Sequence, residues 1–309
     1  MRFNKLDLNL LVALEALLTE RSTTRAAERL HLSQSAMSGA LARLREYFDD
    51  DLLVQVGRQM EPTPRAEVLH EAVRDVLLRI DTSITVQPAF DCTTSEREFR
   101  LFVSDYTQDV LMPQVLALAA QQGATVRFRL LPQVALPARS LERGEADLLV
   151  IPLEYCSTEH PAERLFEDNF VCVVWDQSRH AREGLSVEQY AAAAHVAMQP
   201  AETQQTAHEQ RSTQDQGLSR RIEVRTYSFA TIPLLVIGTE RVATVHRLLA
   251  QRLQAALPIR LLPVPVPIPP LQQGLQWHKY RTQDPGLKWL RQVMHEAANT
   301  LPPPEGPHA

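Results

Sequence analysis

The apolar residues of this chain change their spacing near residue 98, and this change limits the folds that the chain can adopt. Before that point they recur every three or four positions, which is the period of an amphipathic helix. After it they come in short runs, such as 99–104, separated by helical patterns. Short strands that alternate with helices are typical of a largely parallel sheet. The sequence therefore predicts a helical head (residues 1–62) and an α/β body (residues 91–309).

Three helices and a hairpin are predicted in the head. A side chain suited to capping precedes each helix: Asp7, then Ser22 or Thr23, then Ser33. Small Ala26 and Ala27 allow the second and third helices to approach closely, and Leu32 is expected to plug the turn between them. A strand at 52–56 then turns back at residues 57–58.

The exposed face of the third helix suggests a surface that contacts DNA bases. Its apolar residues Met37, Leu41 and Leu44 repeat at three and four positions and predict a buried stripe. The opposite face carries small, hydroxyl, amide and cationic side chains: Gln34, Ser35, Ser38, Gly39, Ala42 and Arg43. The major groove of B-DNA admits a helix, glutamine can bond adenine at two atoms, and serine suits several bases.

Bulk charge does not by itself indicate DNA binding. The chain has a net charge of −5, from 32 Lys and Arg against 37 Asp and Glu, which argues against a protein that coats polyanions generally. Residues 1–65 hold nine basic and nine acidic side chains, so DNA binding is inferred from geometry. Arg43 and Arg45 are expected beside strand phosphates, and Arg58 at the backbone or in the minor groove. The alternative is a three-helix cap with a solvated polar face.

One long helix is predicted over residues 65–83. Its apolar residues recur at helical spacing: Ala66, Leu69, Ala72, Val73, Val76, Leu77 and Ile80. A single amphipathic helix between two domains cannot bury such a stripe alone, so we expect it to pair with a second copy in a dimer seam. The alternative is that the stripe packs only on its own chain.

Two α/β lobes are predicted in the body. Strands are expected at 99–104, 125–131, 146–151, 170–175, 194–198, 221–224 and 241–245, with helices at 111–120, 136–144 and 285–300. Prolines interrupt residues 258–270, which confines that segment to an edge or a crossover, and we interpret it as the return strand between the lobes. Two lobes joined by crossover strands leave a cleft, and such clefts bind small molecules.

Enzyme, metal and membrane signals are weak in this sequence. His295 and Glu296 begin a zinc-binding pattern, but Asn299 stands where its second histidine is needed. No Gly-rich phosphate loop or Gly-x-Ser-x-Gly elbow occurs, and His195 in an apolar strand is better explained as a core residue. Three widely spaced cysteines, no signal peptide and no run of about 20 apolar residues indicate the cytoplasm. We expect no enzyme activity, metal, cofactor or membrane association.

Motifs throughout the chain resemble those of LysR-type transcriptional regulators. In the head and the long helix they are DLNLL (7–11), AAERLHLSQSAMS (26–38), LARLR (41–45), DDLL (50–53) and EPTPRA (61–66). In the body, PLLVIGT (233–239), VAT (242–244), QWH (276–278) and DPGLKWLR (284–291) resemble the branch of nodulation-gene activators and regulators of aromatic catabolism. The resemblance covers nearly the whole chain.

The resemblance implies an α+β multidomain fold with an N-terminal winged helix-turn-helix, a long linker helix and a two-lobed α/β effector domain like a periplasmic binding protein. Expected bounds are 1–62, 63–90 and 91–309, with lobe I at about 91–165 and 270–300 and lobe II at about 166–269. It implies a sequence-specific activator that binds double-stranded promoter DNA and RNA polymerase. It also implies a homodimer through the linker helix, a homotetramer, and a small aromatic or phenolic effector between the lobes, whose binding shifts the tetramer's arrangement.

Geometry and resemblance together give the candidate site residues. For DNA they are Ser33, Gln34, Ser35, Ser38, Arg43, Arg45, Arg58 and Thr63. For the effector they are Ser104, Asp105, Tyr106, Pro152, Asp168, Phe170, Met198, Phe229 and Ile232. Aromatic and apolar side chains with a few hydroxyls suit a phenolic ring, whereas the alternative for each is core packing. A buried Asp168 is expected to pair with a cation or to accept from a phenol.

Two positions depart from the family pattern, because Ser35 and His246 stand where proline is usual. The first turn of the DNA-contacting helix and a hinge of the body are therefore expected to differ. Three functions remain in competition: an effector-responsive LysR-type regulator, a DNA-bound regulator or architectural protein whose cleft binds nothing, and a small-molecule binding or catalytic protein with a helical cap.

Overall fold

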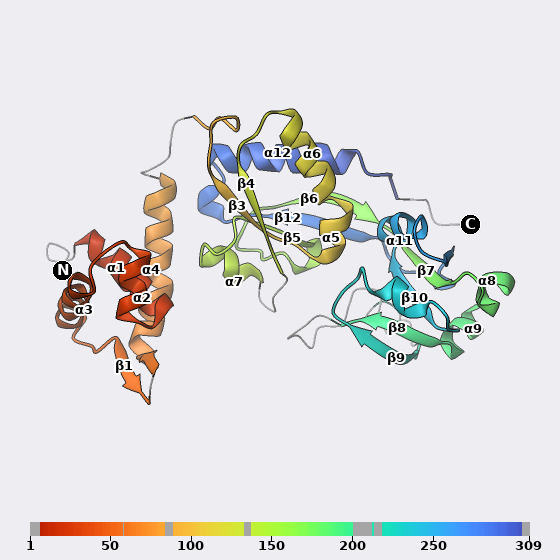
Figure 1. The fold of residues 1–309 in the computed structure, drawn as a ribbon, viewed down its shortest axis with the longest axis horizontal. Coiled ribbons are helices and arrows are strands. Elements are labelled where there is room, and N and C mark those ends of the chain that lie inside the picture. Colours follow the sequence, from red (N-terminus) through yellow and green to blue (C-terminus); the bar gives the residue numbers. More distant parts are fainter. Residues whose placement is uncertain are drawn as a thin grey trace. The chain divides into compact units, whose positions relative to one another are not determined.

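The structure, a computed structural model, describes residues 7–57, 59–83, 89–132, 137–199, 212 and 218–304. The chain divides into two compact units, a head unit of residues 1–87 with 142–144 and a body unit of residues 88–141 with 145–309 (Figure 1). Each unit has its own buried apolar core, so the two are described separately. Among the described helices, none combines the length and the apolar composition needed to cross a membrane.

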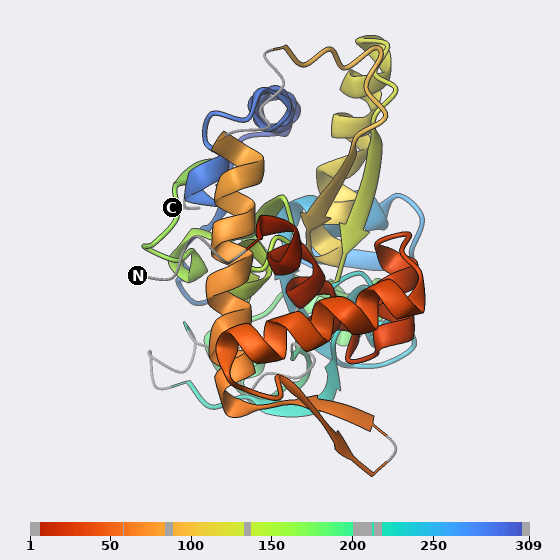
Figure 2. The same cartoon turned by 90° about the vertical axis from the view of Figure 1, so that its left-hand side faces the viewer.

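The described head unit consists of helices and one hairpin. They are α1 (Leu8–Glu20), α2 (Thr23–Arg29), α3 (Gln34–Phe48), β1 (Leu53–Val56), β2 (Gln59–Pro62) and α4 (Pro64–Ser83). The side chains of Asp7, Ser22 and Ser33 cap the first three helices, as the sequence predicts. The two strands pair antiparallel, and Figure 2 shows their hairpin projecting away from the helices of the head.

The linker helix α4 divides its apolar residues between two faces. Four of them enter or pack against the core of the head: Ala66, Leu69, Val73 and Leu77. On the other side Val68 is 72% exposed and Val76 is 39% exposed. The helix therefore buries only part of its apolar surface within its own chain, and leaves an exposed valine face two turns long.

Two five-stranded sheets form the described part of the body unit. The first has the order β4 (Arg127–Leu131), β3 (Glu98–Phe102), β5 (Leu148–Pro152), β12 (Leu271–Gln276) and β6 (Ala162–Asp168). The second has the order β11 (Ile259–Leu262), β7 (Phe170–Trp175), β10 (Val242–His246), β8 (Ala194–Met198) and β9 (Arg221–Thr226). The α-helices are α5 (Asp105–Val110), α6 (Met112–Gln121), α7 (Pro137–Glu142), α8 (Arg179–Glu183), α9 (Val187–Ala192), α11 (Arg247–Gln254) and α12 (Pro285–Asn299). Short 3-10 helices occur at η2 (Leu153–Tyr155), η3 (Ile232–Val236) and η4 (Lys279–Arg281).

Both sheets are mixed, so the expectation of largely parallel sheets is wrong. Strand β3 pairs parallel with β4 and β5, but β12 runs antiparallel to β5 and β6. Likewise β8 pairs parallel with β9 and β10, whereas β7 runs antiparallel to β10 and β11. In each sheet the antiparallel strand is the one by which the chain enters from the other sheet: β7 follows β6 across Asn169 alone, and β12 follows β11.

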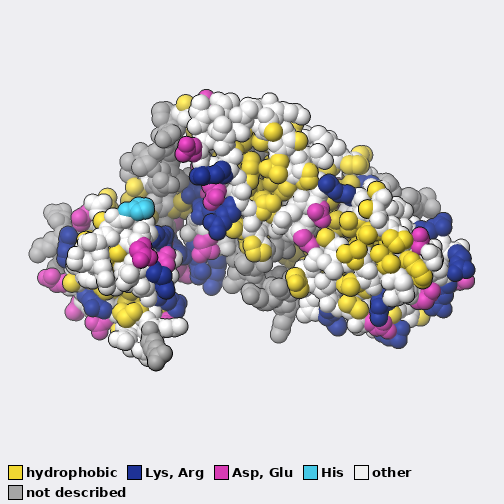
Figure 3. Space-filling view, viewed as in Figure 1, with side chains coloured by type: hydrophobic (Ala, Val, Ile, Leu, Met, Phe, Trp, Pro, Cys, Tyr) yellow, Lys and Arg dark blue, Asp and Glu magenta, His cyan; other side chains and the backbone are white. Residues whose placement is uncertain are grey.

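The proline-rich segment 258–270 is only partly a strand. Its first residues form β11 at the edge of the second sheet, where proline is tolerated, and β12 then begins in the first sheet. The expected return strand is therefore wrong for residues 263–270, which cross without pairing in either sheet. In Figure 3, basic and acidic side chains are interspersed on the visible face of the head, in line with the nine basic and nine acidic residues among residues 1–65.

Candidate functional site

The turn between α2 and α3 brings these helices close together. Ala26 and Ala27 are buried, and the Leu32 N–H donates to the Ala27 carbonyl at 2.9 Å. His31 adopts a φ of 54°, which reverses the chain in the left-handed region. Leu32 does not plug the turn, because it is 47% exposed, and Leu30 packs on the head core instead.

Helix α3 buries one face and exposes a polar one. Met37 and Leu44 are fully buried. The exposed residues include those predicted to contact bases: Gln34, Ser35 and Ser38. Ser33 Oγ accepts from the Ala36 N–H at 3.2 Å and lies 3.0 Å from Ser35 Oγ. The Ser35 hydroxyl therefore lies beside the Ser33 hydroxyl that caps this helix.

The side chains of Arg43 and Arg45, both predicted to contact DNA, have different partners within the protein. The Arg43 side chain is 62% exposed and lies 3.9 Å from Asp7 Oδ2. The Arg45 guanidinium donates from Nε and Nη2 to the carbonyls of Asp51 and Leu53, both at 2.7 Å. Arg45 thus fastens the hairpin to the end of α3, a role that spacing alone did not indicate. Arg58 lies outside the described residues.

Thr63 also has a structural role. Its hydroxyl donates to Asp50 Oδ1 at 2.7 Å, and its Oγ1 accepts from the Ala66 N–H at 3.1 Å. The same Asp50 oxygen accepts from the Leu52 N–H at 2.7 Å. The hydrogen bonds from Thr63 and from Leu52 lower the pKa of Asp50. Asp50, which sequence analysis missed as an organising residue, therefore ties the hairpin to the start of α4.

Five aromatic and acidic residues meet where the two sheets join, and we call Tyr106, Asp168, Phe170, Phe229 and His246 the lobe junction. The Tyr106 ring stacks on the His246 ring with centroids 4.0 Å apart and planes at 18°. Phe229 and Phe170 lie with centroids 4.8 Å and 5.0 Å from His246. His246 is thus the centre of an aromatic cluster.

Asp168 is fully buried and accepts a hydrogen bond from a phenol hydroxyl, but the phenol is that of Tyr106 in the same chain. Tyr106 Oη donates to Asp168 Oδ2 at 2.8 Å, and the Leu248 N–H donates to the same oxygen at 3.1 Å. Arg247 Nε lies 3.8 Å from Oδ1. Burial raises the pKa of Asp168 to about 6, and burial and the neighbouring carboxylate raise that of Tyr106 well above 10.

The stability of the body is expected to carry the pH signature of Asp168. Its folded pKa exceeds its unfolded value of about 4, so its contribution is present below pH 4 and is lost as pH rises through about 6. Relative to Asp168→Asn, wild type should lose about 2 kcal/mol between pH 4 and pH 7. Urea unfolding followed by emission of the tryptophans, all of which lie in the body, measures this difference. A pH-independent difference would contradict the raised pKa.

Asp105 joins the first lobe to the second. Its Oδ2 accepts hydrogen bonds from Ser228 Oγ at 2.7 Å and from the Ala230 N–H at 3.1 Å. Both donors lie in the segment that follows β9. Its Oδ1 accepts from the Tyr106 N–H at 3.0 Å. Ser228 carried no local signal in the sequence, since a single serine after a strand is common in loops.

The other predicted effector residues are not brought to the junction. Ser104 caps α5 by accepting from the Thr107 N–H at 3.2 Å. Pro152 ends β5 opposite Gln273. Met198 and Ile232 are buried in the core of the second sheet, as the alternative of core packing predicts for them.

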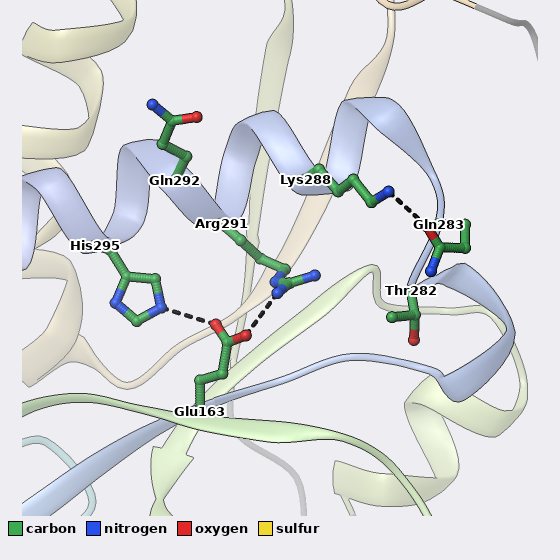
Figure 4. A pocket seen from close by; sticks show the side chains of 7 residues that line it. All are labelled: Glu163, Thr282, Gln283, Lys288, Arg291, Gln292 and His295. Atoms are coloured by element: carbon green, nitrogen blue, oxygen red, sulfur yellow. Dashed lines mark hydrogen bonds and ion pairs between the residues drawn. The ribbon is translucent and has the colours of Figure 1, made fainter.

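A polar pocket of about 410 Å³ lies beside α12 (Figure 4). Glu163 accepts from Arg291 Nη2 at 2.6 Å and lies 2.9 Å from His295 Nε2. Burial raises the pKa of Glu163, but hydrogen bonds from His295 and Arg291 outweigh it and leave the pKa below its usual value. Lys288 donates to Gln283 at 2.6 Å. The pocket differs from the lobe junction because Glu163, Arg291 and His295 pair with one another and no Phe, Tyr or Trp is among its lining residues.

Two family models match this chain. One, described as the bacterial regulatory helix-turn-helix protein of the lysR family, matches residues 8–67. The other, described as the LysR substrate binding domain, matches residues 93–299. Together with the exposed polar face of α3 and the two-sheet body, these matches show that the chain belongs to the LysR family of DNA-binding transcriptional regulators and is not an enzyme.

Within this family the chain is similar to nodulation regulators. Nodulation protein D 2 of Rhizobium tropici is 42% identical over 307 residues, which cover 99% of this chain and 98% of that protein. Nodulation protein D 1 of Rhizobium leguminosarum bv. phaseoli is 40% identical over 304 residues, covering 98% and 97%. Among solved structures, a probable transcriptional regulator from Pseudomonas aeruginosa matches with a TM-score of 0.66 and 29% identity, covering 94% of this chain and 97% of that one.

Proposed function

We propose that this chain is a transcriptional activator that contacts promoter bases with α3 and responds to a small aromatic or phenolic effector at the lobe junction. The observation that carries the proposal is the likeness to nodulation proteins D along nearly the whole chain, joined to the aromatic cluster around His246. An effector acts by binding one arrangement of the protein better than another, and the junction, where the two sheets meet, is suited to such coupling.

For DNA contact we propose that the N-terminal half of α3 enters the major groove. Gln34, Ser35 and Ser38 are exposed there, and Ser33 begins the helix. Arg43 would lie over a DNA phosphate. Arg45 and Thr63 support the hairpin from within the protein, and they would contact the DNA backbone only near the start of the hairpin. Arg58, which the sequence predicts in the turn of the hairpin, would reach the adjacent DNA backbone or minor groove.

Replacing Arg58 with alanine should weaken binding to all sequences alike, because a phosphate contact carries no base preference. The slope of log K against log salt should become shallower by about 1. Anisotropy titrations with a labelled operator at several salt concentrations measure the slope. Arg260→Ala removes an arginine that is exposed on β11, and it should leave the slope unchanged. Lost discrimination at a single operator base would instead show that Arg58 contacts that base.

We also propose a homodimer through the exposed face of α4, assembling further into a homotetramer that contacts RNA polymerase when activating. The free valine face of α4 supports the dimer, since an apolar stripe on a long surface helix is stabilised by a partner helix. Effector binding would change the spacing of the DNA-binding heads, and so the bend imposed on the operator.

The effector is tested by footprinting the operator with and without hydroxylated aromatics, alongside thermal shifts of the full chain. We expect a stabilisation and an altered footprint with at least one compound. A second candidate function, a regulator whose cleft binds nothing, is favoured by one observation: Tyr106 already satisfies Asp168. No thermal shift with any aromatic, together with intact operator binding, would support that second function and contradict the first.

A further inference from the structure

A hydroxyl and an amide of the second lobe converge on one carboxylate of the first. Thr231 donates to Ser228 Oγ from its N–H at 3.2 Å and from its own hydroxyl at 2.8 Å. Because Ser228 Oγ accepts these two bonds, its single proton is free to point at Asp105, which lies 2.7 Å away. The Ala230 N–H donates to the same Asp105 oxygen at 3.1 Å. Such convergent donors are what a carboxylate ligand requires.

The carboxylate that fills these donors belongs to the protein. Both oxygens of Asp105 are bonded, since Oδ1 accepts from the Tyr106 N–H at 3.0 Å. The donors of Ser228 and Ala230 are thus already occupied by an internal anion that is part-buried against the lobe junction. An effector with a carboxylate would have to displace Asp105 and leave its charge without these partners.

A second carboxylate lies on the other side of Tyr106. Asp168 is fully buried, and the cation closest to it on the described chain, Arg247, also donates to Gln251 Oε1 at 3.1 Å and to the Pro303 carbonyl at 2.8 Å. Tyr106 thus bonds to two carboxylates, Asp105 through its N–H and Asp168 through its hydroxyl, and the guanidinium of Arg247 pairs with Asp168. Like charge at short range disfavours an anionic ligand, whereas a neutral hydroxyl donor is accepted by either carboxylate.

We propose that Asp105 determines the class of effector: its carboxylate occupies the donors that an anionic effector needs, so the site takes neutral hydroxylated aromatics and rejects aromatic carboxylates. The inference rests on the proposed binding of an aromatic effector at the lobe junction. It goes further by assigning the choice between neutral and anionic rings to one side chain.

The test uses two probes of the same shape and different charge, 4-hydroxybenzamide and 4-hydroxybenzoate, titrated calorimetrically into the full chain. Wild type should bind the neutral amide at least about tenfold more tightly than the carboxylate, because Asp105 and Asp168 repel the negative charge of 4-hydroxybenzoate. Asp105→Ala vacates the donors of Ser228 and Ala230, so it should gain affinity for 4-hydroxybenzoate and reverse the preference. Asp105→Asn removes the charge but keeps an acceptor oxygen, and should give an intermediate ratio.

Asp109→Ala is the matched control, because it removes another acid of α5 and should keep the wild-type ratio. Tryptophan emission and the melting temperature show whether each variant is folded. An unchanged ratio in Asp105→Ala, or a wild type that prefers the carboxylate, would overturn the role of Asp105 while leaving an aromatic site in place. Binding of neither probe to wild type or to any variant would overturn both this inference and the proposed aromatic effector.

Discussion

Replacing Val68 with aspartate should dissociate the proposed α4 dimer into monomers without unfolding the head. Val68 is 72% exposed on α4 and shares a helix face with Ala72 and with Val76, which is 39% exposed. In a lone chain an exposed substitution of this kind changes stability by about 0.5 kcal/mol or less. In a two-fold seam it places two carboxylates opposite each other out of water, which should weaken the dimer by about 100-fold or more. Sedimentation velocity measures the change.

Two further aspartate variants make this prediction specific. Val187→Asp alters another exposed valine, 40% exposed on α9, and should leave the dimer intact. Leu77→Asp alters a residue of α4 that packs on the head core, so it should lower the melting temperature of the head. A persistent Val68→Asp dimer, or equal dissociation of the α9 variant, would contradict a seam through α4.

Replacing Gln34 with alanine should relax discrimination at one operator position by about 1–3 kcal/mol, which is roughly tenfold to a hundredfold in relative affinity. Gln34 is exposed at the first turn of α3, where its amide is free to bond a base edge and is not needed for folding. Affinity for unrelated duplex should change little, because phosphate contacts supply that binding.

The measurement is a set of anisotropy titrations against the operator and its single-base variants at one salt concentration. Gln121→Ala, which removes an exposed amide at the end of α6, should behave as wild type. Uniform weakening by Gln34→Ala on every duplex would place the base contacts on another part of the head.

Local signals were enough to predict most elements. The caps Asp7 and Ser33 marked helix starts, and the closing helix was expected at 285–300 and found at Pro285–Asn299. Strand β6 was missed because adjacent Leu165 and Phe166 break both the two-residue and the helical period. The mixed sheets were missed because strand direction depends on where the chain crosses between lobes, which no local pattern records.

The site was predictable in part. Tyr106 was chosen because it follows the first strand of the body, and Asp168 because it flanks the predicted crossing into the second lobe. The structure joins them by one hydrogen bond across 62 residues of sequence. That the tyrosine would satisfy the acid depends on tertiary packing, which sequence alone does not give. Arg45 was assigned to phosphates from its charge, yet its guanidinium bonds two carbonyls, because local acceptors compete for any donor near a turn.

The central claim is that the exposed face of α3 selects a DNA sequence, and competition binding on the chain's own upstream region tests it most directly. At one salt concentration, a fragment of that region should bind about 10³-fold or more tightly than a scrambled duplex of equal length and composition. Gln34→Ala should narrow that ratio while keeping the affinity for the scrambled duplex. Equal affinity of wild type for both duplexes would contradict sequence recognition by α3.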